Sequence, residues 1–132
     1  MPRVVHFEIN SDDPERAARF YKSLFGWKIK KWEGDVDYWM CDTGPEKMGI
    51  NGGILKRSSP HLGTVNTIGV DSIDLFLKKI ERAGGRTVMP KSAVGEMGWV
   101  AYCLDTEGNT FGIFETNKEF MRKQAAKKRK KK

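Results

Sequence analysis

The first hydrophobic positions of the chain predict a strand followed by a helix. Arg3–Ile9 is rich in Val, Ile and Phe, which favours a β-strand, and His6 lies in the middle of it. Asp13 suits the N-cap of the helix, Pro14 suits its first position, and Gly26 suits its end. One face of the helix should pack inward because apolar residues recur at helical spacing, at Ala17, Phe20, Tyr21 and Leu24.

Three candidate strands follow this helix, and then the same order of elements begins again. The strands are predicted in WKIKKW, DYWMCDT and GINGGILKR, and the cluster Ser58–Pro60 marks a boundary after them. Beyond it, GTVNTIGV predicts a strand, and Asp71 or Ser72 should cap a second helix that ends at Ala83–Gly85. Three more strands are predicted in RTVMPKSAV, GWVAYCLDT and TFGIFET, the last two joined by a TEGN turn.

This order predicts an α/β (α+β) fold made of two βαβββ modules, at about residues 1–59 and 60–117. One module alone would leave an apolar sheet face exposed. We therefore expect the two modules to form a curved mixed sheet, with the helices outside and a central cleft within.

Composition places the chain among single-domain globular proteins. It has 132 residues, of which 39% are hydrophobic, and no apolar run approaches the roughly 20 residues of a membrane-spanning helix. No apolar leader follows the first charged residues, so we expect a soluble, cytoplasmic protein without membrane contact. Cys41 and Cys103 match no zinc spacing and are expected to be free thiols.

The net charge of +7 comes from the end of the chain. Residues 118–132 carry nine Lys or Arg and one Glu, so the other 117 residues carry a net charge of −1. A run of like charges repels itself, which predicts a disordered, solvated tail at 118–132. Weak contact of this tail with a polyanion is the alternative, but the rest of the chain has no basic stripe, so nucleic-acid binding is not expected.

Several motifs resemble those of the vicinal oxygen chelate superfamily, which includes glyoxalase I, bleomycin-resistance proteins and extradiol dioxygenases. The matching stretches are HFEI, DPERAARFYKSLFGWKI, the AGG helix end and WVAYCLDTEGNTFGIFE. The resemblance covers roughly residues 3–116, with Thr106 where the family's D-P-x-G-N turn has Pro. It implies the fold strongly and the activity weakly, because this fold carries several enzyme activities and non-enzymatic drug binding.

The resemblance also implies where a metal would be held. Four positions converge in metal-using members, and here they fall on His6, at or near Gly53, on Asn66 and on Gly112. The spacings within the two modules agree, at 47 and 46 residues. The family's set is His or Gln, Glu, His and Glu, whereas a glycine has no side chain with which to ligate a metal. We therefore expect no cofactor, and a divalent metal is disfavoured.

If the strands are regular, neighbouring residues do not supply the missing metal ligands. Glu8 shares the strand face of His6 and is the second candidate for chemistry, whereas Glu115 should face away from Gly112. His6 and Glu8 are the candidates for catalytic or proton-carrying roles, and the alternative is that His6 is a hydrogen-bonded cleft residue. Replacing carboxylates by glycines should leave room for a ligand near Asn66, with candidate walls at Trp39, Met40, Met97, Trp99 and Tyr102. Core or dimer-interface packing is the alternative for these aromatic and Met residues.

Two hypotheses for the function follow. The first is a glyoxalase/bleomycin-resistance-like protein that binds a small molecule without metal or turnover. The second is a lyase or dioxygenase-type enzyme related to lactoylglutathione lyase that uses His6 and Glu8. The resemblance implies a homodimer, and the sequence determines neither the ligand nor whether the cleft is shared between two chains.

Overall fold

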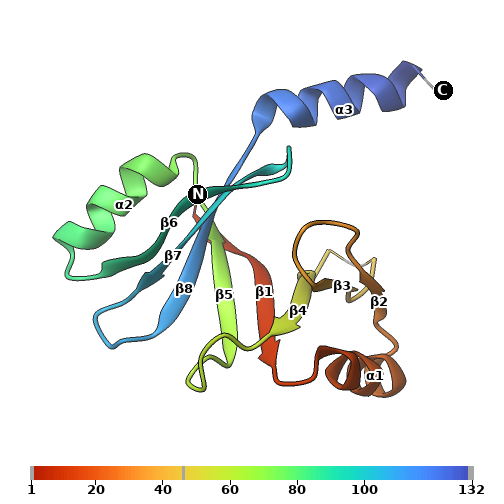
Figure 1. Ribbon diagram of the computed structural model, residues 1–132. Helices are drawn as coiled ribbons and strands as arrows, with labels where there is room; N and C mark the ends of the chain where they lie inside the picture. Colours follow the sequence, from red (N-terminus) through yellow and green to blue (C-terminus); the bar gives the residue numbers. More distant parts are fainter. Residues whose placement is uncertain (1, 46, 131–132) are drawn as a thin grey trace. The chain divides into compact units, whose positions relative to one another are not determined.

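The computed structural model describes residues 2–45 and 47–130, and the chain forms two compact units (Figure 1). Val4–Thr67 forms the N-terminal unit, and the C-terminal unit is built mainly from Ile68 onward. The chain passes from one unit to the other within strand β5 (Thr64–Gly69), later than the boundary near residue 60 that the sequence predicted. The reason is that the chain enters β5 beside β1: the Asn10 amide N–H donates to the Gly63 carbonyl at 3.2 Å.

The N-terminal unit is a βαβββ module followed by the first half of β5. Its strands lie in the order β2-β3-β4-β1-β5. The pair β1–β4 is parallel, whereas β3 runs antiparallel to β2 and to β4, so the sheet is mixed. The elements are β1 (Arg3–Ser11), α1 (Pro14–Phe25), β2 (Lys28–Lys31), β3 (Tyr38–Asp42) and β4 (Gly52–Lys56).

The C-terminal unit repeats this order from the last residues of β5. Strand β8 lies next to β7, and β7 next to β6, both pairs antiparallel, and β5 neighbours β8. The elements are α2 (Ile73–Arg82), β6 (Arg86–Val94), β7 (Gly98–Leu104), β8 (Thr110–Thr116) and α3 (Lys118–Lys130). The predicted α/β fold with two βαβββ modules is therefore confirmed; the central cleft remains a prediction.

Side chains at the helix ends explain where α1 and α2 begin. Asp13 caps α1 by accepting from the Arg16 N–H at 3.1 Å, and Gly26 ends it in the left-handed conformation, as the sequence predicted. Of the two candidates for α2, Ser72 is the cap and accepts from the Leu75 N–H. Glu115 adds a second contact by accepting from the Ile73 N–H at 2.9 Å, so its carboxylate is engaged at the start of α2.

Each unit has its own apolar core between its helix and its strands. Ala18, Ile29, Cys41 and Ile54 form the first, and Val70, Ile73, Ala101 and Ile113 form the second. Both cysteines are buried free thiols, and burial raises the pKa of the Cys41 thiol to about 11, which leaves it protonated. Among the described residues, no helix is long and apolar enough to cross a membrane.

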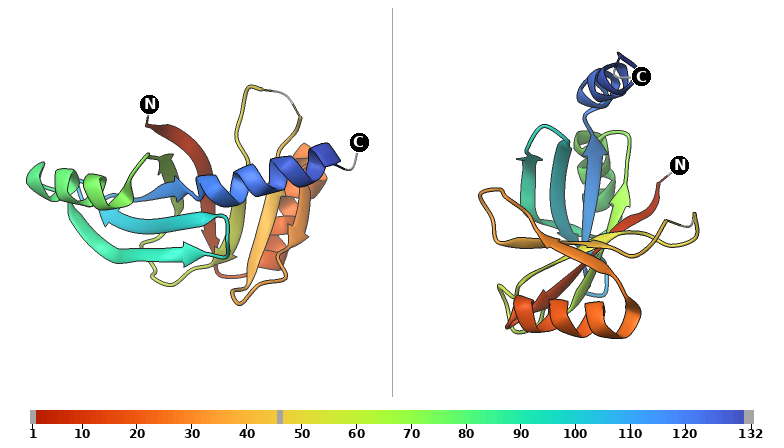
Figure 2. Two further views of the ribbon diagram at one scale, coloured as in Figure 1. Left: turned by 90° about the horizontal axis from the view of Figure 1, so that it is seen from above. Right: turned by 90° about the vertical axis from the view of Figure 1, so that its right-hand side faces the viewer.

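The end of the chain corrects one sequence-based expectation. Lys118–Lys130 forms helix α3, which follows the end of β8, rather than a disordered tail (Figures 1 and 2); residues 131 and 132 lie outside the described part. The Asn117 side chain caps α3 by accepting from the Phe120 N–H at 3.1 Å. Ala, Gln, Lys and Arg are good helix formers, and cations are favoured near a helix C-terminus, so propensity and the helix dipole oppose charge repulsion.

The turn between β7 and β8 generates a testable prediction. Asp105 accepts hydrogen bonds from the Asn109 backbone and side chain and from the Glu107 backbone, which lower the pKa of its carboxyl group. The ionised form therefore stabilises the fold above the ordinary pKa of 3.8, and this contribution is lost as the pH falls through the lowered pKa. Asp105→Ala should reduce Tm at neutral pH, and the deficit should shrink in strong acid. The control is Asp35→Ala, at an exposed loop position. If it lowers Tm as much as Asp105→Ala does, and neither loss depends on pH, the stabilising role of the ionised Asp105 is contradicted.

Candidate functional site

Strand β1 presents three polar residues on the face opposite to α1. Phe7 and Ile9 pack against the N-terminal core, so the alternate residues His6, Glu8 and Asn10 point to the other face. Glu8 and Asn10 are only 7% and 8% exposed, and His6 is half-buried. The predicted pairing of His6 and Glu8 on one strand face thus has the geometry that alternation requires.

Neighbouring strands extend this polar face across the sheet of the N-terminal unit. Glu8 is the register partner of Gly53 in β4, and Gly53 is the register partner of Met40 in β3. Register partners project to the same side, so Met40, which is 48% exposed, lies on the His6 face. Tyr38 precedes Met40 by two residues and shares this face.

The Tyr38 ring lies over Gly53 and reaches His6. A Cβ atom at position 53 would be 2.0 Å from Tyr38 Cζ and 2.1 Å from its Oη, so Tyr38 occupies the space of a side chain there. The same Oη lies 2.7 Å from His6 Nε2 and shares a hydrogen bond with it. The two rings are close to parallel, at 15°. The expectation that glycine at position 53 leaves open room is therefore wrong: Tyr38 fills it.

Burial controls the protonation of His6. Desolvation lowers the pKa of its imidazole, and the nearby Glu8 carboxylate opposes this by raising it. The net direction is downward from 6.5, so His6 is mainly neutral at physiological pH. A neutral imidazole can accept a proton or a hydrogen bond, which is the state that a general base or a polar ligand contact needs.

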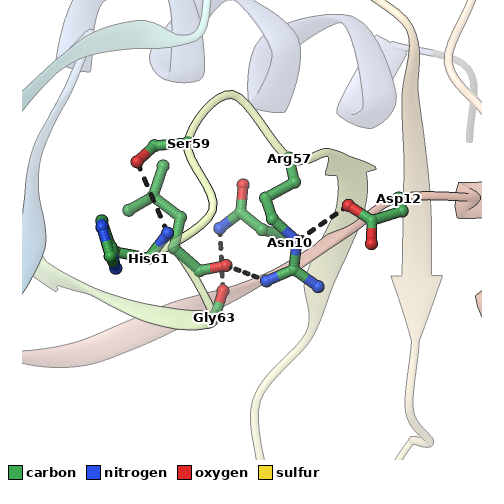
Figure 3. Close-up of polar contacts among 7 residues, drawn as sticks. Asn10, Asp12, Arg57, Ser59, His61 and Gly63 are labelled. Atoms are coloured by element: carbon green, nitrogen blue, oxygen red, sulfur yellow. Dashed lines mark hydrogen bonds and ion pairs between the residues drawn. The ribbon is translucent and has the colours of Figure 1, made fainter.

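Asn10 is engaged in holding the loop that follows β4. Its side-chain amide donates to the Gly63 carbonyl at 2.8 Å. Arg57 secures the same loop by donating to Asp12 at 3.1 Å and to the Leu62 carbonyl, and Figure 3 shows these contacts together. His61 lies in this loop and is exposed. These contacts order the chain beside the polar face and leave His6, Glu8 and Tyr38 as its chemistry-bearing groups.

The other predicted ligand-binding residues are distributed over several surfaces. Trp39 lies on the α1 side, packed against the N-terminal core, and so does not join His6. Trp99 likewise packs against the core of the C-terminal unit. Tyr102 is the register partner of Gly112 and lies on the opposite face of β7 from Trp99, as alternation predicts. Asn66 is exposed on β5.

The donor set of the N-terminal unit does not match the metal set that the resemblance implies. Position 53 has no side chain and its space holds a tyrosine ring, and the Nε2 atom of His6 is hydrogen-bonded to that tyrosine. Within residues 2–45 and 47–130, no group of three or more His, Cys, Asp or Glu side chains is placed to hold a metal ion. These residues do not fit a divalent cation, which needs about three protein ligands.

Sequence reasoning missed Tyr38, the residue that completes this site. The available signal was a glycine opposite a strand that begins with aromatic residues, because a cross-strand aromatic ring can cover a glycine. Alternation alone could not reveal the contact, because the ring crosses diagonally from the Leu55 level of β4 to His6.

A double-mutant cycle tests the packing of Tyr38 on Gly53. Gly53→Ala should destabilise the protein by about 1–3 kcal/mol, since the new methyl group must displace the ring. The same substitution in a Tyr38→Ala background should cost much less, because the ring is gone. Urea denaturation of the four proteins measures this coupling, with Gly63→Ala as control, since a Cβ there meets nothing within 4 Å. Additive effects at positions 53 and 38 would refute the contact.

NMR titration of the His6 Cε1–H signal tests the electrostatics. The midpoint should lie below 6.5, and Glu8→Gln should lower it further, because the carboxylate favours the imidazolium. The folded state then binds this proton less tightly than the unfolded state, so His6 should reduce stability as the pH falls below 6.5. A midpoint above 6.5, or an upward shift in Glu8→Gln, is the opposite result.

Comparisons with known proteins agree with this architecture. The family model described as Glyoxalase/Bleomycin resistance protein/Dioxygenase superfamily matches residues 3–113. The chain is 29% identical over 117 residues to a "Glyoxylase-like domain-containing protein" of Didymella fabae, covering 84% of this chain and 91% of that protein. It is 26% identical over 116 residues to "Putative glyoxylase CFP32" of Mycobacterium tuberculosis, covering 84% of this chain and only 44% of that relative.

Solved structures show the same fold at low sequence identity. A hypothetical protein from Bacillus halodurans matches with a TM-score of 0.68 at 15% identity, covering 89% of this chain and 96% of that one. Methylmalonyl-CoA epimerase from Mycobacterium tuberculosis matches with a TM-score of 0.65 at 15% identity, covering 90% and 91%. Because the family model matches most of the chain, this protein belongs to the Glyoxalase/Bleomycin resistance protein/Dioxygenase superfamily.

Proposed function

We propose that this protein binds a small organic molecule on the polar face formed by His6, Glu8, Tyr38 and Met40, without a divalent metal. The observation that supports this proposal most directly is the 2.7 Å hydrogen bond between Tyr38 Oη and His6 Nε2, above Gly53. This hydrogen bond occupies the Nε2 atom of His6, which is the strongest metal donor among the family's metal positions that fall in the N-terminal unit. It also presents a hydroxyl, an imidazole and an aromatic edge close together.

The chemistry of this face favours a ligand with both polar and apolar parts. His6 and Tyr38 can exchange their mutual hydrogen bond for bonds to a ligand, and Glu8 is a buried acceptor beside them. Met40 is unbranched and half exposed, so it can adapt its shape to an apolar group. Both the soluble cytoplasmic location and the homodimer remain proposals alongside this one.

An enzyme is the second candidate, and the electrostatic coupling of Glu8 to His6 favours it. The carboxylate raises the pKa of the imidazole while burial lowers it, an arrangement that can tune a proton carrier. Relatives named as glyoxylases, and structural neighbours that are epimerases, make lyase or isomerase chemistry the first to assay. On this hypothesis His6 is the proton acceptor and Glu8 supports it.

A ligand screen separates the two candidates. Aromatic acids, phenols and amines would be screened by thermal shift in the presence and absence of EDTA. Binding should raise Tm equally with and without EDTA. Tyr38→Ala should weaken the affinity for the best compound at least tenfold, which corresponds to about 1.4 kcal/mol. Phe25→Ala is the matched control, because Phe25 is an exposed aromatic residue of α1 on the other side of the sheet.

The same protein would be assayed with the hemithioacetal of methylglyoxal and glutathione, and with catechol. Turnover that requires an added divalent metal and is abolished in His6→Ala would overturn the proposed function and establish the enzyme. Binding that is lost in EDTA would also contradict the proposal.

A further inference from the structure

We propose that helix α3 is a sequence-independent binding surface for the phosphate backbone of double-stranded nucleic acid. This inference is independent of the small-molecule site, because every residue that it uses belongs to the C-terminal unit. The sequence-based expectation was a disordered tail, with weak contact between this tail and a polyanion as the alternative, and the helix gives that alternative an ordered surface.

The first observation is where the charge lies. Residues 118–132 hold nine of the 24 basic residues and one of the 17 acidic residues of the chain. The protein therefore has an almost neutral body and one strongly basic element. Such a separation indicates an electrostatic contact made by that element alone.

The second observation is that the charges stand on an ordered, exposed helix. Lys118, Arg122, Lys123, Lys127 and Lys128 are all exposed on α3. The one acid, Glu119, lies 3.7 Å from Lys123, but both side chains are more than 70% exposed, so solvent weakens this pair. The basic groups thus remain available to phosphates.

The third observation is that the base of α3 is fixed to its unit. The Asn117 N–H donates to the Met97 carbonyl at 2.8 Å, and the Asn117 side chain caps the helix. Phe120 is half-buried in the first turn. A helix that is already formed loses less conformational entropy on binding than a disordered tail would.

The distribution of side chains favours nucleic acid over a membrane surface. Basic residues occur around α3 rather than along one stripe, and its apolar residues (Phe120, Met121, Ala125 and Ala126) form no continuous face. An interfacial membrane helix needs such a face. A 13-residue helix is about 20 Å long, and a DNA major groove admits a helix between two rows of phosphates, which suits charges on several sides.

Fluorescence anisotropy with a labelled duplex of about 20 base pairs and mixed sequence tests the proposal. The full chain should bind with micromolar affinity at about 50 mM salt, and log K should fall with log salt with a slope of about −4 or steeper. The variant Lys123→Gln/Lys127→Gln/Lys128→Gln should weaken binding at least tenfold and make the slope shallower by about 2 to 3. Glutamine keeps the helix propensity, and far-ultraviolet circular dichroism would verify that α3 persists.

The matched control is Lys22→Gln/Lys28→Gln/Lys30→Gln, which changes the net charge equally at exposed positions of the N-terminal unit. It should bind almost as wild type does. Absence of binding at low salt, or an equal loss in the control, overturns the proposal. Tighter binding to phosphatidylserine-containing vesicles than to the duplex at the same salt would also overturn it, and would assign α3 to membranes.

Discussion

The absence of a side chain at position 53 is the constraint on which the candidate site depends. Any Cβ there would fall about 2 Å from the Tyr38 ring, so only glycine lets the ring lie across β4. From that position the hydroxyl reaches His6 Nε2. At this position, or next to it, the resemblance implies a metal ligand. Here Gly53 instead leaves space for the Tyr38 ring, which contacts His6.

That contact shapes the chemistry of its surroundings. Partial burial lowers the pKa of the His6 imidazole, and the Glu8 carboxylate limits this effect. The neutral histidine can then share its hydrogen bond with tyrosine or give it to a ligand. In the proposed function, this exchangeable hydrogen bond is what recognises the ligand, and no metal is needed for it.

The sequence predicted the fold well because the fold depends on local patterns. Asp13, Pro14 and Gly26 specify the ends of α1 through interactions within a few residues, and the second helix follows the same logic at Ser72. Strand alternation also predicted that Glu115 faces away from Gly112. Its hydrogen bond with the Ile73 N–H joins residues far apart in the sequence, so alternation could not predict that contact. The disorder predicted for 118–132 was wrong for α3, because charge repulsion was weighed without the Asn117 cap and the helix propensity of Lys, Ala and Gln.

The site was only partly predictable. His6 was found because the family resemblance places it at the first metal position, and Glu8 because alternation places it on the same strand face. Trp39 was assigned to a ligand wall, although strand parity places it in the core. Tyr38 was missed because its contact is diagonal and depends on what position 53 lacks. Such contacts need three-dimensional register, which a hydrophobic pattern does not contain.

The most direct test of the central claim is the metal content of untagged protein purified without chelators, measured by elemental analysis beside His6→Ala and Tyr38→Ala. The account predicts far less than one metal per chain in the wild type, and no decrease in His6→Ala. Near-stoichiometric metal that disappears in His6→Ala would show that the Tyr38–His6 contact does not exclude a cation, and would contradict the account.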